Sequence, residues 1–91
     1  MIETQHLIIS GRVQRVGFRN FMVESARALG ITGWVRNCTD GTVEAVIAGP
    51  PAALAQMIEC ARRGSAHAIV EEIRITKAAG RLERFEMRPT V

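Results

Sequence analysis

The segment from Gly11 to Arg19, with the sequence GRVQRVGFR, limits the fold of this chain more than any other feature. Its first half continues an alternation of apolar residues at Leu7, Ile9 and Val13, which is typical of a strand. From Phe18 onward, apolar residues recur at helical spacing instead. A strand that enters a helix through so short a turn aims several backbone N–H groups at one point, which suits an anion.

An amphipathic helix is expected over residues 18–29. Its apolar stripe includes Phe18, Met22 and Ala26, whereas Arg27 falls on the polar side. Gly30 follows at the position where a left-handed residue commonly ends a helix.

Two more strands and a second helix are expected next. Residues 31–37 and 42–48 read as strands, and Asp40-Gly41 is the strongest turn signal between them. Prolines are tolerated in the first turn of a helix, so Pro50-Pro51 predicts that a helix follows. Its apolar stripe and its cationic end are formed by Leu54, Met57, Ile58, Ala61, Arg62 and Arg63, and Gly64 stops it.

The last part of the chain predicts two strands. Ile69, Ile73 and Ile75 indicate a fourth strand, residues 79–81 a turn, and alternation around Phe85 and Met87 a short final strand. The order is therefore βαββαβ with a short extra C-terminal strand, which is the ferredoxin-like arrangement. We expect an α+β two-layer sandwich in which two helices cover an antiparallel sheet. A length of 91 residues fits a single domain, residues 1–91.

Composition narrows the range of partners. The net charge of +3 attracts anions in general, but no dense basic run indicates nucleic acid, and the chain has no tyrosine for base stacking. No apolar run is long enough to span a bilayer, and the first residues do not resemble a signal peptide. Cys38 and Cys60 form no CxxC motif, and His6 and His67 lack metal-ligand spacing. These observations predict a monomeric cytoplasmic protein with no cofactor, no metal, no nucleic acid and no membrane partner.

The predicted anion site is centred on the turn before the first helix. Glycine at position 17 leaves room for a positive φ and for close approach of an anion. Arg19, in the first helical turn, can close its planar fork on a phosphate. The backbone N–H groups proposed to form the anion cradle belong to Arg15, Val16, Gly17, Phe18 and Arg19. An isolated arginine at a helix start is more often a solvated surface residue, so the surrounding turn is what favours a site.

Two segments in the same order resemble the acylphosphatase family: the Gly11–Arg19 segment, and Gly33-Trp34-Val35-Arg36-Asn37 followed by Asp40-Gly41-Thr42-Val43-Glu44. The resemblance extends from Gln5 to about Met87. It implies one acylphosphatase-like domain that hydrolyses acyl phosphates to a carboxylate and inorganic phosphate. It also implies that Arg19 and Asn37 are the catalytic pair, with Asn37 holding the attacking water, and that no metal, histidine or covalent intermediate is needed.

The chain departs from the family pattern at Arg15, where members commonly have glycine. If this position requires a positive φ, an arginine strains the turn by roughly 1 kcal/mol; if it does not, Arg15 adds a cation beside the phosphate. A second departure lies at residues 63–67, where the family often has prolines, and where this loop should be less rigid. Arg15 keeps an alternative open, namely a catalytically weak module that binds an anion or a partner.

Overall fold

The computed structural model describes residues 1–80 and 82–91. Its elements are β1 (Glu3–Arg12), α1 (Phe18–Leu29), β2 (Thr32–Asn37), β3 (Val43–Gly49), α2 (Pro51–Arg63), β4 (Ile69–Lys77) and β5 (Phe85–Met87). The predicted ferredoxin-like order is confirmed, and α1 has the predicted bounds. Of the turn predicted at residues 79–81, Arg81 lies outside the described residues.

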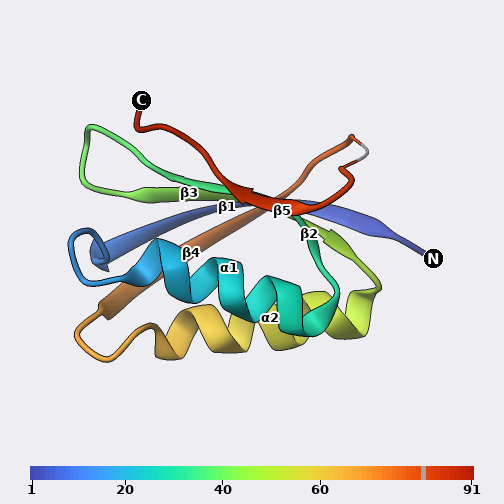
Figure 1. Ribbon diagram of the computed structural model, residues 1–91, viewed down its shortest axis with the longest axis horizontal. Coiled ribbons are helices and arrows are strands. Elements are labelled where there is room, and N and C mark those ends of the chain that lie inside the picture. Colours follow the sequence, from blue (N-terminus) through green and yellow to red (C-terminus); the bar gives the residue numbers. More distant parts are fainter. Residues whose placement is uncertain (81) are drawn as a thin grey trace.

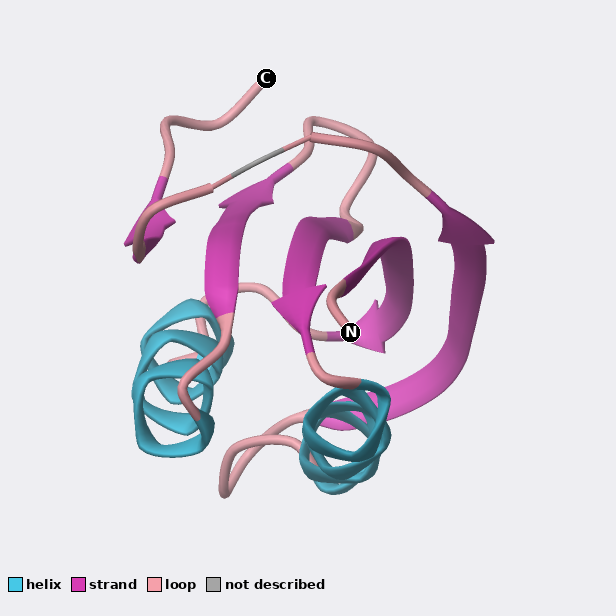
Figure 2. Ribbon diagram, turned by 90° about the vertical axis from the view of Figure 1, so that its right-hand side faces the viewer, coloured by secondary structure: helices cyan, strands magenta, loops and turns pink. Residues whose placement is uncertain are grey.

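The two helices lie side by side and cover one face of a curved sheet (Figures 1 and 2). The strand order in the sheet is β4-β1-β3-β2-β5. β1 pairs antiparallel with both β3 and β4, and β2 pairs antiparallel with β3. The fold is therefore the predicted two-layer α+β sandwich.

The prediction of a wholly antiparallel sheet needs one correction. The short strand β5 pairs parallel with β2, with Phe85 opposite Gly33. After β4 the chain crosses to the opposite edge of the sheet, where it runs beside β2 in the same direction. Phe85 is then buried in the core, so its side chain closes that edge against the helical layer.

The core lies between the sheet and the helices. Alternate residues of β1, Leu7 and Ile9, face the helices and are fully buried. The apolar stripes of the two helices supply the other layer, as their spacing predicted: Phe18, Met22, Ala26, Leu54, Met57 and Ala61.

Glycine is required at position 33 of β2, where the backbone of β3 lies against it. Gly33 has φ +141°, and a Cβ atom at this position would lie 1.8 Å from the carbonyl oxygen of Val46. No side chain fits there, so this glycine sets how closely the strand that ends in Asn37 approaches its neighbour. Among the described residues, no helix is long and apolar enough to cross a membrane.

Candidate functional site

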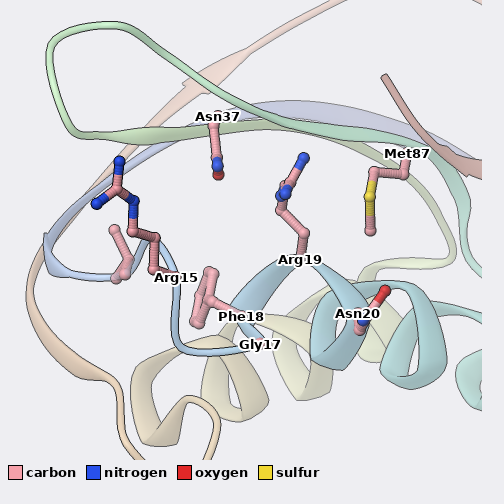
Figure 3. A pocket seen from close by; sticks show the side chains of 8 residues that line it. Arg15, Gly17, Phe18, Arg19, Asn20, Asn37 and Met87 are labelled. Atoms are coloured by element: carbon pink, nitrogen blue, oxygen red, sulfur yellow. The ribbon is translucent and has the colours of Figure 1, made fainter. Parts of the chain in front are cut away.

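A pocket of about 110 Å³ lies between the start of α1 and the end of β2 (Figure 3). This space is large enough for several water molecules, and so for a group of phosphoryl size. Its lining residues come from four parts of the chain: Val13, Arg15, Gly17, Phe18, Arg19, Asn20, Asn37 and Met87. The structure therefore brings Arg19 and Asn37 to one place, together with three other members of the predicted cradle, Arg15, Gly17 and Phe18. Val16, the remaining member, is not among the lining residues.

The segment 13–17, called the cradle loop below, connects β1 to α1. Gly17 has φ +75° and occupies the N-cap position of α1. Arg15 has φ +62° and, among the described residues, is the one non-glycine residue with a positive φ. The sequence left open whether this position requires the left-handed region; in the structure it does, and an arginine there costs about 1–2 kcal/mol. Such strain is retained chiefly at functional sites.

Several backbone N–H groups of the cradle are free to bind a ligand. The first hydrogen bond of α1 runs from the N–H of Phe21 to the carbonyl oxygen of Gly17, over 3.0 Å. No hydrogen bond within the described part of the chain has its donor among the backbone N–H groups of residues 15–19. The first turn of α1 also holds no acidic residue and no side-chain cap. This helix end is thus a positive dipole end with open donors.

Asn37 faces this helix end from the opposite wall of the pocket. In Figure 3 its side chain points down from β2, and the guanidinium of Arg19 rises toward the same strand. The Asn37 Oδ1 atom is buried and has no hydrogen-bond partner within the structure. A buried acceptor without a partner costs about 1–3 kcal/mol, so its retention in a pocket points to a ligand or a water.

Two side chains that sequence reasoning missed hold the cradle loop in place. Gln14 Nε2 donates to the carbonyl oxygens of Cys38 and Thr42, each over 2.8 Å, and so ties the loop to the β2–β3 hairpin. Ser65 Oγ donates to the carbonyl oxygen of Val16 over 2.8 Å, which ties the loop to the segment after α2. The segment 63–67, expected to be less rigid, is therefore anchored to the site through Ser65.

The backbone of Asn37 is fixed by the C-terminal segment. The N–H of Val91 donates to the carbonyl oxygen of Asn37 over 3.2 Å, and the N–H of Thr39 donates to the carbonyl oxygen of Val91 over 2.7 Å. The following turn is closed by Asp40, whose carboxylate accepts from the N–H and the hydroxyl of Thr42. The hydroxyl and the N–H of Thr42 hold the pKa of Asp40 below its usual value. Asp40 thus shapes the turn, as predicted, and does not line the pocket.

The sheet face away from the helices carries a second charged group, centred on Glu44. Arg36 donates to Glu44 Oε1 through Nε over 2.7 Å, and His6 Nε2 lies 2.6 Å from Glu44 Oε2. Partial burial by itself raises the pKa of Glu44, but the hydrogen bonds from His6 and Arg36 outweigh it and hold this pKa below its usual value. The guanidinium carbons of Arg36 and Arg88 lie 4.7 and 4.8 Å from the centroid of the Trp34 ring. Trp34 therefore packs on the sheet and is not part of the pocket.

Histidine and cysteine take no part in the pocket. His6 belongs to the Glu44 group, His67 is exposed, and both cysteines are free thiols outside the pocket lining. Among residues 1–80 and 82–91, no three His, Cys, Asp or Glu side chains are grouped so as to hold a metal ion. The chemical groups gathered at the pocket are backbone N–H donors, guanidinium donors and an amide.

Comparison with known proteins identifies the family. The acylphosphatase family model matches residues 5–87. The chain belongs to the acylphosphatase family. An acylphosphatase of Azorhizobium caulinodans is 53% identical over 73 residues, which are 80% of this chain and 78% of that protein.

Solved acylphosphatase structures have the same fold. The crystal structure of acylphosphatase from Bacillus subtilis superimposes with a TM-score of 0.91 at 36% identity, over 97% of this chain and 99% of that chain. An acylphosphatase structure from Coxiella burnetii superimposes with a TM-score of 0.92 at 30% identity, over 96% and 93% of the two chains. The predicted family and the predicted ferredoxin-like fold are both confirmed.

Proposed function

We propose that this protein is an acylphosphatase that hydrolyses acyl phosphates to a carboxylate and inorganic phosphate. One observation carries the proposal: the orphaned acceptor Asn37 Oδ1 lines the same pocket as the Arg19 guanidinium and the open N–H groups of the cradle loop. A phosphoryl group needs donors for its oxygens, and an attacking water needs an acceptor that orients it. The pocket offers both, and membership of the acylphosphatase family supports the assignment.

Binding of the phosphoryl group falls to the helix end. The N–H groups of residues 15–19 and the fork of Arg19 donate hydrogen bonds to the non-bridging oxygens. Negative charge is spread over these oxygens in the loose transition state of phosphoryl transfer, so fixed donors lower the barrier without rearranging. These donors can neutralise the charge themselves, and for this reason we propose a reaction that needs no metal ion.

The attacking water is assigned to Asn37. Its Oδ1 accepts a hydrogen bond from the water and turns the water oxygen toward phosphorus, in line with the acyl oxygen. As the new P–O bond forms, the bond from phosphorus to the acyl oxygen breaks, and its electron pair leaves with the carboxylate. The water proton passes to a phosphate oxygen. A carboxylate is a good leaving group, so the step needs no general acid.

The test is hydrolysis of benzoyl phosphate in the presence of a chelator, by the wild type and by Arg19→Ala. Losing a transition-state donor costs roughly 2.7–4 kcal/mol, so we expect kcat/KM to fall about 100- to 1,000-fold. Arg27→Ala is the matched control, because Arg27 is an exposed arginine in the last turn of the same helix. A folded Arg19→Ala protein with wild-type turnover contradicts the assignment, as does activity that disappears only on chelation.

A binding module that turns over poorly is the second candidate, because the strained Arg15 side chain lines the pocket. This candidate predicts phosphate binding without hydrolysis by the wild type, and turnover that appears in Arg15→Gly. Wild-type hydrolysis of benzoyl phosphate excludes it.

Location in the cytoplasm, a monomeric state, and the absence of a nucleic-acid partner stay predictions. A sedimentation experiment tests the monomer. Oligonucleotide binding at low salt tests the nucleic-acid prediction, because contacts to phosphates weaken steeply as salt rises.

A further inference from the structure

Arg15 adds a second guanidinium to the pocket lining that holds Arg19. The Arg15 side chain is exposed, whereas that of Arg19 is partly buried. Among the described residues, the ion pairs with carboxylates involve His6, Arg36, Arg62, Arg74 and Arg88. Neither arginine of the pocket has an acidic partner in the described part of the chain, so the charge of each is available to a ligand.

The two guanidinium groups are placed for different tasks. In Figure 3 the Arg15 side chain rises from the cradle loop on one side of Asn37, and Arg19 rises from α1 on the other side, toward Met87. Arg19 and the open N–H groups already supply the donors that one phosphoryl group can use. The exposed Arg15 guanidinium is therefore free to bind a part of the substrate other than the phosphoryl group.

The backbone conformation of Arg15 supports a role for its side chain. Arg15 has φ +62°, a left-handed conformation that glycine would adopt without strain. The exposed side chain contributes nothing to the core, and no hydrogen bond within the described residues uses it. Its remaining property is a planar, permanent positive charge with a fork of donors.

We propose that Arg15 is a specificity-determining residue, which favours acyl phosphates whose acyl group carries a second carboxylate. This inference rests on the proposed function. The guanidinium fork matches a carboxylate in two parallel hydrogen bonds. A second phosphate on the acyl group would compete with the first for Arg19 and the cradle. A carboxylate would compete less, because it has two acceptor oxygens where a phosphoryl group has three. The preferred substrates are thus monophosphorylated dicarboxylic acids.

The test compares benzoyl phosphate with its 3-carboxy and 4-carboxy derivatives, which share one scaffold and differ by one charge. The measured quantity is the ratio of kcat/KM for each carboxylated substrate to kcat/KM for benzoyl phosphate. Arg15→Gln keeps the side-chain length and the left-handed strain but removes the charge. We expect this ratio to fall about fivefold in Arg15→Gln for at least one isomer, the range of an exposed ion pair. The wild-type ratio should also fall as salt is raised.

Arg12→Gln is the matched control, because Arg12 is exposed at the end of β1, near the pocket but outside its lining. It lowers the net charge by the same amount and should leave the ratio unchanged. Equal ratios in the wild type and Arg15→Gln overturn the inference. This includes the case in which kcat/KM falls equally for the carboxylated substrate and for benzoyl phosphate, because Arg15 then binds the phosphoryl group. If the wild type hydrolyses none of the three substrates, the proposed function itself fails, and that result is distinct from equal ratios.

Discussion

Arginines on the outer face of the sheet have partners within the protein, whereas the arginines of the pocket have no acidic partner among the described residues. On the face away from the helices, Arg36 is held by Glu44, and Arg36 and Arg88 stack on Trp34. In the pocket, no carboxylate of the described residues pairs with Arg15 or Arg19. The arginines of the outer sheet face are bound to side chains of the protein itself. The pocket arginines have free donors, and the buried Oδ1 of Asn37 beside them has no hydrogen-bond partner. The contrast separates side chains that stabilise the protein from side chains that await a ligand.

After the loss of activity expected for Arg19→Ala, the next largest effect is expected for Asn37. Asn37→Ala removes the acceptor that orients the water, so we expect kcat for benzoyl phosphate to fall about 100-fold. Because Oδ1 has no partner in the folded protein, its loss should not lower the free energy of unfolding by more than about 1 kcal/mol. Inorganic phosphate binding, measured by calorimetry, should persist. A loss of phosphate binding in the folded variant would show that Asn37 binds the phosphoryl group and not the water.

For Glu44 we expect the reverse of Asn37, namely a loss of stability with little change in activity. Glu44→Gln removes the charge that His6 and Arg36 share, so the free energy of unfolding at pH 7 should fall by roughly 1–2 kcal/mol. Turnover should stay within about twofold of the wild type, because Glu44 does not line the pocket. Urea unfolding and the benzoyl phosphate assay measure the two effects separately. A large loss of turnover without loss of stability would erase the distinction between the two regions.

The same variant has a defined pH dependence. The pKa of Glu44 is lower in the folded protein than its usual value of 4.5. The stability it contributes is therefore present above about pH 4.5 and is lost as pH falls through the folded pKa. The gap between wild type and Glu44→Gln should close as urea unfolding is repeated at lower pH. Glu59→Gln, at an exposed carboxylate on α2, is the control and should show little gap at any pH. A gap that widens in acid would mean that the sign of the pKa shift is wrong.

The smallest expected effect concerns Arg15. Arg15→Gly releases the left-handed strain and should raise the free energy of unfolding by about 1 kcal/mol. Arg12→Gly, at a residue of β1 with no positive φ, should lower it by about 0.5–1 kcal/mol. Urea midpoints of the two variants thus move in opposite directions. If both fall, the loop is not strained at Arg15, and the argument that strain marks a functional side chain loses its basis.

The sequence was sufficient for features that depend on near neighbours. The bounds of α1 follow from its apolar spacing and from Gly30, which has φ +70° and closes the helix. Arg19 could be placed at the site because it lies within the same turn as the cradle. The parallel pairing of β5 could not be predicted, because alternation identifies a strand but not its partner.

Contacts between distant segments explain what was missed at the site. Gln14 and Ser65 resemble ordinary polar residues in the sequence, and their hydrogen bonds join parts of the chain that only the fold brings together. Met87 was read as a strand residue, yet it lines the pocket. The φ of Arg15 could not be decided because arginine itself gives no signal for the left-handed region, and only the geometry of the turn does.

The pocket draws its lining from β5 as well as from the segment after β1, and its Asn37 backbone is held by the residues that follow β5. Such contacts between distant segments close late and slowly during folding, because chain entropy must be lost before they form. A chain whose helices and central strands are already in place still lacks a finished site. After dilution from denaturant, activity should therefore recover later than the helical circular dichroism signal. The time at which activity returns would then report the last step of sheet assembly.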